Sequence, residues 1–186
     1  MIFLSGCRLK IYKEFKIDKN YLIFSNHQSM LDIFVINSIL DLRDYRWLVK
    51  SSLFYIPIFG LLLYSAGYIS VERRKKYKAY KAIQKAINLL NKGKVSIIIF
   101  PEGTRSTEDT ILKFKSGGIK IALSSNKEVL PIILKNTLYA KKRKSFMINP
   151  VIVKAKILKP VDLKNFSKRD GIDYIYNLML EEYKKL

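Results

Sequence analysis

Apolar runs of strand length alternate along this chain with stretches that have helical spacing. β-branched and aromatic residues dominate the runs, which predicts strands at residues 8–15, 21–24, 45–50, 68–71, 95–100, 129–134 and 151–157. Helices are predicted at residues 33–40, 80–90, 115–123 and 172–183, with Gly93 ending the second. This alternation predicts one α/β domain over residues 1–186, with a mixed, partly parallel central sheet flanked by helices.

Residues 53–69 form the most apolar stretch of the chain. Their composition is that of a transmembrane helix, but the stretch is slightly short and is interrupted by Pro57 and Gly60. We therefore favour a buried helical segment followed by a strand over a membrane span. An element that faces a membrane surface is a third interpretation, which the sequence leaves open.

A polar cluster, Ser25-Asn26-His27-Gln28-Ser29-Met30-Leu31-Asp32, separates the second predicted strand from the first helix and holds the only histidine. In one continuous helix, His27 and Asp32 would be about 500° apart and on different faces. They can meet only if His27 lies in a turn and Asp32 in the first helical turn. Ser29-x-x-Asp32 resembles a capping box, which predicts Ser29 as N-cap and Asp32 at the third helical position. The alternative is that these residues only cap a helix.

A second polar cluster, Phe100-Pro101-Glu102-Gly103-Thr104-Arg105-Ser106, follows a predicted buried strand. Glu102 and Arg105 therefore lie just beyond the carboxyl end of a strand, where α/β proteins place ligands. Gly103 allows close approach of the backbone to a ligand, and Arg105 offers a fork of donors suited to phosphate. The alternative is an ordinary turn with one surface ion pair.

Together, Asn26-His27-x-Ser29-x-x-Asp32 and the second cluster resemble blocks of the glycerolipid acyltransferases of the 1-acylglycerol-3-phosphate acyltransferase type. Gly67-Tyr68-Ile69-Ser70-Val71-Glu72-Arg73 and Val129-Leu130-Pro131-Ile132 resemble two weaker blocks of that family. Lys50, residues 56–60 and residues 114–117 also occupy positions where the family carries similar residues. The resemblance covers residues 21–134 in the family's block order, and it implies the same α/β sandwich.

The resemblance implies transfer of a fatty acyl group to the free hydroxyl of 1-acylglycerol-3-phosphate, which gives phosphatidic acid. The donor would be an acyl thioester of coenzyme A or acyl carrier protein, and no cofactor is expected. His27 would be the general base, and Asp32 would hold its tautomer. A covalent route through Ser29 ranks lower. The expected substrate-binding residues are Lys50, Arg73, Glu102, Gly103, Thr104, Arg105 and Lys115. Glu102 would bond a glycerol hydroxyl or hold Arg105 in place.

A net charge of +20, from 35 basic and 15 acidic residues, predicts a surface that attracts polyanions. A related acyltransferase acting on glycerol 3-phosphate or another lysolipid is an alternative. A nucleic-acid-binding protein is a second alternative, from a different class, but no recognised reading motif is present, so no specific nucleic acid is expected. One histidine and one cysteine make a structural zinc site implausible, and no metal is expected.

The expected location is the cytoplasmic face of a cell membrane, with peripheral or monotopic attachment. The basic runs at residues 73–76 and 141–144 would face anionic lipid. About two dozen residues precede the first block, so we expect the N-terminal membrane anchor of many relatives to be absent or reduced here. Near the N-terminus, Leu4-Ser5-Gly6-Cys7 resembles the end of a lipoprotein signal peptide. The residues before it include no basic n-region and no long apolar stretch, so a lipoprotein signal is not expected. Heavy use of Lys, Ile, Asn and Tyr suggests a bacterial source.

Overall fold

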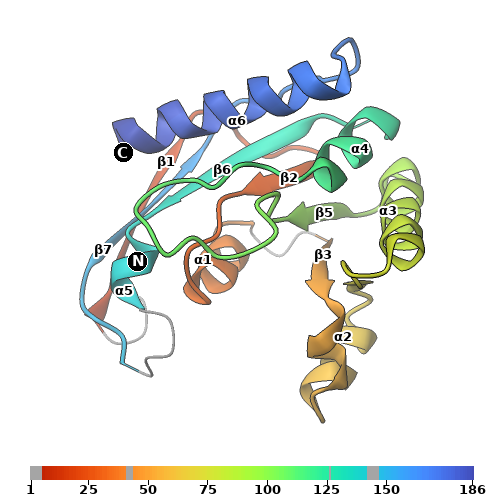
Figure 1. Cartoon of the computed structure of the whole chain (residues 1–186). Coiled ribbons are helices and arrows are strands. Elements are labelled where there is room, and N and C mark those ends of the chain that lie inside the picture. The colour runs from red at the N-terminus through yellow and green to blue at the C-terminus, as the bar shows by residue number, and fades with distance from the viewer. Residues whose placement is uncertain (1–5, 41–43, 126, 142–146) are drawn as a thin grey trace.

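The computed structural model describes residues 6–40, 44–125, 127–141 and 147–186. Within them, seven strands form one sheet in the order β1-β7-β6-β2-β5-β3-β4 (Figure 1). The strands are β1 (Arg8–Lys13), β2 (Leu22–Ser25), β3 (Tyr45–Lys50), β4 (Ile69–Val71), β5 (Ser96–Ile99), β6 (Val129–Lys135) and β7 (Ile152–Ile157). Neighbouring strands are parallel except for β6 and β7. The predicted α/β fold with a mixed, partly parallel sheet is confirmed.

Helices cover both faces of this sheet (Figure 1). The helical elements are α1 (Leu31–Ile39), the 3-10 helix η2 (Ser51–Tyr55), α2 (Phe59–Ser65), α3 (Lys76–Asn91), α4 (Ser116–Ser124), α5 (Thr137–Ala140) and α6 (Lys168–Lys185). Buried residues of α3, α4 and α6 share one apolar cluster, and those of α1 and α5 share the other. Gly93 follows α3 with φ +71°, and its N–H bonds to Leu90 O, as the predicted helix end requires.

The central strand β2 explains why the two clusters form. Side chains alternate between the faces of a strand, so Leu22 and Phe24 enter the cluster under α3, α4 and α6, whereas Ile23 enters the other. All four residues of β2 are buried, as expected for a parallel strand covered by helices on both faces. The parallel strands β2, β3, β4, β5 and β6 therefore bring their carboxyl ends to one edge of the sheet.

The prediction of a buried helical segment within residues 53–69 is wrong for α2. The segment leaves the sheet at the end of β3 and projects from it before returning at β4 (Figure 1). Leu63 packs inward, but Ile58, Leu61 and Tyr64 are 78%, 70% and 78% exposed. The reason is position: α2 lies in the connection between β3 and β4, the last two strands at one side of the sheet, where no sheet face is available to cover it. We call residues 51–65 the apolar projection.

Local backbone geometry shapes the apolar projection. Ile58 has φ +63°, a costly conformation for a β-branched residue. A Cβ at Gly60 would lie 2.0 Å from the Phe54 carbonyl oxygen, so only glycine fits there. The backbone turn at Ile58 and Gly60 therefore holds the apolar side chains of the projection outward. Among the described residues, no helix combines the length and apolar character that crossing a bilayer requires.

Candidate active site

The turn between β2 and α1 is held by Asn26, which is buried. Its Nδ2 donates to the Leu134 carbonyl and its Oδ1 accepts from the Leu134 N–H, both at 2.8 Å. One side-chain amide thus pairs with both backbone groups of a residue in β6, as a neighbouring strand would. Residues 25–32, which we call the His27 turn, are fixed to the carboxyl edge of the sheet in this way.

His27 and Asp32 meet with His27 in the turn and Asp32 in the first turn of α1, the one arrangement that their spacing allows. The imidazole Nδ1 lies 2.7 Å from Asp32 Oδ2, and the Asp32 side chain is 0% exposed while that of His27 is 16% exposed. Oδ2 also accepts from the backbone N–H of Gln28 at 2.7 Å and of Ser29 at 2.8 Å. A carboxylate acceptor assigns the imidazole proton to Nδ1, which leaves the lone pair on Nε2 able to accept a proton.

The predicted capping arrangement is partly wrong. Helix α1 begins at Leu31 with Met30 as its N-cap residue, so Asp32 is the second helical residue and not the third. The Ser29 hydroxyl donates to the Lys141 carbonyl at 3.0 Å and accepts a long hydrogen bond from the Leu31 N–H at 3.4 Å. The reciprocal half of a capping box is present, because the Asp32 carboxylate accepts from the Ser29 N–H. The acidic side chain therefore closes the turn and holds the imidazole with the same oxygen.

Phe100, at the end of β5, fixes the plane of the imidazole. Its ring stacks on His27 with centroids 3.9 Å apart and planes inclined by 7°. Trp47 of β3 packs against the Phe100 ring, with ring centroids 5.2 Å apart. Aromatic residues from β3 and from the end of β5 therefore support the imidazole ring, while Asp32 holds its Nδ1.

Glu102 joins the His27 turn to residues 100–115, which we call the Glu102 loop. Its side chain is 1% exposed; Oε1 accepts from the His27 N–H at 2.6 Å and Oε2 from the Leu112 N–H at 2.7 Å. Burial raises the pKa of Glu102 to about 8, although the two amide donors favour the charged form. The buried Glu102 carboxyl group therefore holds the His27 turn and the Glu102 loop together. Its expected contact with an acceptor stays a prediction.

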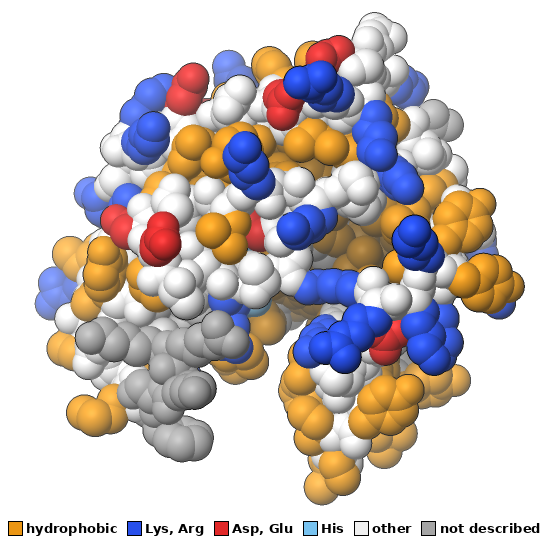
Figure 2. Space-filling view, in the orientation of Figure 1, with side chains coloured by type: hydrophobic (Ala, Val, Ile, Leu, Met, Phe, Trp, Pro, Cys, Tyr) orange, Lys and Arg blue, Asp and Glu red, His pale blue; other side chains and the backbone are white. Residues whose placement is uncertain are grey.

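Basic side chains converge on Gly103, whose φ is +76°. A Cβ at this position would lie 3.4 Å from Lys115 Cγ and 3.6 Å from Arg73 Nη1, so both side chains pass close to its backbone. Arg73 follows β4, and Lys115 immediately precedes α4. Figure 2 shows Lys and Arg side chains around a hollow in this face of the molecule. The cluster suits an anionic group.

The remaining predicted residues are placed at the same edge. Thr104 is exposed and Arg105 partly buried in the Glu102 loop. Lys50 is exposed at the end of β3, where it pairs in register with Val71, two residues before Arg73. Of the basic run at residues 141–144, only Lys141 falls within the described residues.

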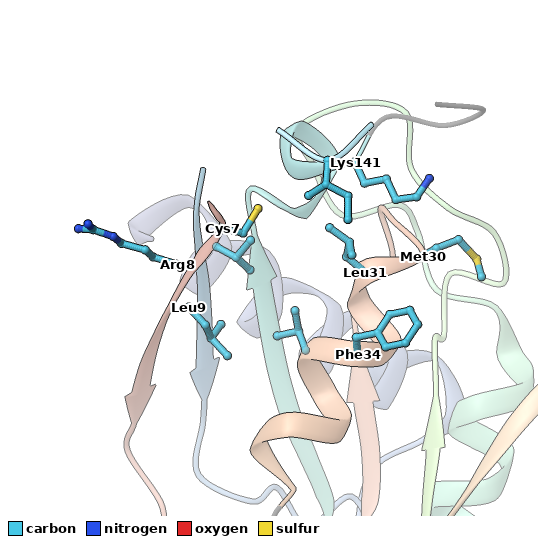
Figure 3. Close-up of a pocket in the computed structure, with 10 residues that line it drawn as sticks. Cys7, Arg8, Leu9, Met30, Leu31, Phe34 and Lys141 are labelled. Atoms are coloured by element: carbon cyan, nitrogen blue, oxygen red, sulfur yellow. The ribbon is translucent and has the colours of Figure 1, made fainter. Parts of the chain in front are cut away.

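An apolar cavity of about 190 Å³ opens beside the start of α1 (Figure 3). Met30, Leu31 and Phe34 line one side of the cavity. Cys7, just before β1, and Leu9, within β1, line the opposite side. Met30 and Leu31 belong to the His27 turn, so one wall of the cavity is formed by that turn. Its lining suits a hydrocarbon group. The described residues contain no group of three or more His, Cys, Asp or Glu side chains arranged to hold a metal ion.

The sequence model of the family described as Acyltransferase matches residues 8–135, which include every residue of the site named above except Cys7 and Lys141. The chain belongs to the Acyltransferase family.

Named members of this family include proteins that are similar over most of the chain. The 1-acyl-sn-glycerol-3-phosphate acyltransferase of Saccharomyces cerevisiae is 31% identical over 171 residues, covering 90% of this chain and 56% of the yeast protein. That of Limnanthes douglasii is 28% identical, covering 94% of this chain and 62% of its own. The chain thus spans about three fifths of the length of the curated relatives it matches.

A solved structure is similar as well. The crystal structure of the 1-acyl-sn-glycerophosphate (LPA) acyltransferase PlsC from Thermotoga maritima superposes with a TM-score of 0.79 at 27% sequence identity. The match covers 95% of this chain and 71% of the Thermotoga chain. The acyltransferase fold seen here therefore extends beyond the family match at residue 135, through β7 and α6.

Three residues that shape this candidate site have no individual role in the sequence predictions. Asn26 and Gln28 belong there only to a polar cluster, and Phe100 only to the end of a strand. Asn26 pairs with a residue 108 positions away, so no local pattern could reveal its partner. For Phe100, an aromatic residue directly before the Pro-Glu-Gly turn was the available signal.

Proposed function

We propose that this chain transfers a fatty acyl group from an acyl thioester to the free hydroxyl of 1-acylglycerol-3-phosphate, giving phosphatidic acid. The observation that carries the proposal is the His27 and Asp32 pair, held at 2.7 Å in a turn that leaves the imidazole partly exposed. The names of relatives that share the site's motifs support the choice of acceptor.

In the proposed reaction, His27 Nε2 removes the proton of the acceptor hydroxyl as its oxygen attacks the thioester carbonyl. The resulting tetrahedral intermediate collapses, the ester C–O bond is kept, the C–S bond breaks, and the thiolate takes the proton from the imidazolium. Asp32 stabilises the imidazolium and keeps the proton on Nδ1 at the start of the cycle. The Phe100 ring keeps the imidazole plane aimed at the acceptor.

The acceptor phosphate would lie against the basic cluster at Gly103. Arg73 and Lys115 already converge there, and Arg105, two residues after Gly103 in the same loop, would add a bidentate donor. Thr104 and Lys50, both exposed at this edge of the sheet, would bind outlying oxygens of the acceptor or the donor. Glu102 would act mainly by holding the His27 turn against this loop.

Two features support the proposed donor. The apolar cavity beside α1 offers a place for a fatty acyl chain close to His27, and the charge of +20 suits an anionic carrier. Coenzyme A and acyl carrier protein both fit that description, and each is an arm of the test. No resident cofactor or metal takes part in the proposed steps.

We also propose peripheral attachment to the cytoplasmic face of an anionic bacterial membrane through the apolar projection. Its exposed large side chains are Tyr55, Ile56, Ile58, Phe59, Leu61, Leu62 and Tyr64. The basic residues 73–76 follow one strand later, and each contributes about 1 kcal/mol near an anionic bilayer. Because the projection and the Gly103 cluster both adjoin the ends of β3 and β4, attachment would bring the acceptor site to the lipid surface.

The test is a panel of acceptors with labelled acyl-coenzyme A or acyl carrier protein: 1-acylglycerol-3-phosphate, glycerol 3-phosphate and lysophosphatidylcholine. We expect the largest kcat/KM with 1-acylglycerol-3-phosphate, and a turnover about 10²–10⁴-fold lower in the matched control His27→Ala. Preference for glycerol 3-phosphate or another lysolipid would assign a different acceptor. Retained RNA together with no acyl transfer would favour the nucleic-acid-binding alternative.

A further inference from the structure

The C-terminal helix α6 reaches the His27 turn through one side chain. Tyr183, in the last turn of α6, is 1% exposed, and its hydroxyl accepts a hydrogen bond from Gln28 Nε2 at 2.8 Å. Gln28 is the residue after His27, and its backbone N–H donates to Asp32 Oδ2. One residue therefore connects α6, 155 positions away, with the carboxylate that holds the imidazole.

The same hydroxyl also contacts the Glu102 loop. Tyr183 donates to Asp109 Oδ1, and Asp109 Oδ2 lies 3.3 Å from Lys135 Nζ. Lys135 Nζ in turn sits 3.9 Å from the centroid of the Tyr183 ring. Burial raises the pKa of Tyr183, so the phenol keeps its proton and serves as both donor and acceptor.

These contacts complete a set of connections between the two loops of the site. Gln28 Nε2 also donates to the Glu108 carbonyl at 3.1 Å, and the Ser106 N–H donates to the His27 carbonyl at 2.8 Å. The Leu112 N–H donates to Glu102, which holds the His27 N–H. Tyr183 is the member of this network that lies outside both loops and outside the part of the chain matched by the family model.

We propose that Tyr183 is a positioning residue for the His27 and Asp32 pair, acting through Gln28 and Asp109. The proposal rests on the proposed acyl transfer for its kinetic consequence. Tyr183 would not touch substrate; its hydroxyl holds the Gln28 side chain and the middle of the Glu102 loop in one arrangement. Small misplacement of a reacting pair lowers turnover strongly, whereas a phosphate cluster at Gly103 would still bind the acceptor.

The test compares Tyr183→Phe, which removes only the hydroxyl, with Tyr174→Phe, which removes an exposed hydroxyl from the same helix. We expect Tyr183→Phe to lower kcat by about tenfold, with KM for the acceptor within about twofold. Tyr174→Phe should match the wild type. Unchanged kcat in Tyr183→Phe, or a loss fully explained by a smaller folded fraction, would overturn the proposal.

A second readout does not depend on turnover. His27 is the only histidine, so its ¹⁵N imidazole signals are unambiguous in a labelled protein. We expect Tyr183→Phe to change the signal of Nδ1, because the hydrogen bond to Asp32 is repositioned, and Tyr174→Phe to leave it unchanged. An unchanged imidazole spectrum in folded Tyr183→Phe would overturn the positioning role. If the wild type transfers no acyl group, this spectrum still tests positioning, so the two failures can be told apart.

Asp109→Ala supplies a variant that tests the same network if Tyr183→Phe folds poorly, because Asp109 lies near the surface. It should lower kcat in the same direction and shift the same imidazole signal. Combining Tyr183→Phe with Gln28→Leu should lower kcat little beyond the larger single effect, since the two residues act as a unit. Fully multiplicative losses would show that they act separately.

Discussion

The His27 turn and the apolar projection invert the usual distribution of residues in opposite ways. In the turn, polar side chains are buried: Asn26, Ser29 and Asp32 are almost inaccessible. In the projection, large apolar side chains such as Ile58 and Leu61 are exposed. Buried polar groups are costly unless they are paired, and exposed apolar groups are costly unless something covers them. The buried polar groups of the turn therefore indicate a site held by internal hydrogen bonds, and the exposed apolar groups of the projection indicate a surface that an apolar partner covers.

The two regions are also held in shape differently. Long-range hydrogen bonds hold the turn, from β6 through Asn26, from the Glu102 loop and from α6 through Gln28. Local geometry holds the projection, through Ile58 and the close fit of Gly60 under Phe54. Changes in the turn should therefore alter chemistry, and changes in the projection should alter where the protein resides. The following experiments test that division.

The largest expected effect is in His27→Ala. If His27 is the base, the variant should keep its fold and lose a factor of about 10²–10⁴ in turnover, since the chain has no second histidine to substitute. Turnover and melting temperature are measured together, and vesicle binding should be unchanged. A folded variant with wild-type acyl transfer would remove His27 from the mechanism.

Asp32→Asn comes next. The amide can hold the wrong imidazole tautomer and offers a donor where Gln28 and Ser29 already donate, so both turnover and stability should fall. Turnover should fall about 10²-fold or more beyond any loss of folded protein. The double variant with His27→Ala should be little worse than His27→Ala alone. Independent, multiplicative losses would argue that Asp32 only caps the turn.

The apolar projection is tested by replacing Leu61 and Leu62 with serine. Burying a leucine side chain contributes about 1.5–3 kcal/mol, so the double variant should bind anionic vesicles at least tenfold more weakly. Tyr174→Ser, which changes an exposed side chain on α6, is the matched control. Activity on dispersed short-chain acceptor should persist. Binding should also weaken with salt, and equal binding to neutral vesicles at low and high salt would exclude the electrostatic part.

Arg105→Lys tests the border between the two regions, where the acceptor phosphate would lie. An ammonium keeps the charge but cannot copy a bidentate guanidinium, so apparent KM for 1-acylglycerol-3-phosphate should rise about tenfold with a smaller change in kcat. Steady-state kinetics at fixed donor concentration measure this. Kinetics identical to the wild type would leave Arg105 without a role in acceptor binding.

The smallest effect concerns pH. Burial raises the pKa of Glu102 to about 8 from an ordinary value of 4.5, so between these values the folded protein holds a proton that the unfolded chain has released. The free energy of unfolding should therefore fall as pH rises through this range, by at most about 1.4 kcal/mol per pH unit, and level off above it. Glu102→Gln should flatten this slope. A slope that persists would assign it to another group.

The amino-acid sequence alone is enough to predict the local features of this protein. Alternating strand and helix patterns predict the α/β sheet, and the five-residue spacing of His27 and Asp32 requires a turn between them if they are to meet. Both follow from short-range geometry, since backbone periodicity and helix rotation are set by neighbouring residues. The placement of Gly103 and Arg105 after a buried strand follows from the same reasoning.

Only the tertiary structure decided what surrounds these features. The pairing of Asn26 with Leu134 and of Gln28 with Tyr183 joins residues 108 and 155 positions apart, and no local pattern encodes such contacts. The exposure of α2 was likewise beyond the sequence, because an apolar stretch reads the same whether a sheet face covers it or not. Here β3 and β4 lie at the edge of the sheet, so the stretch between them has no face to pack against and projects outward.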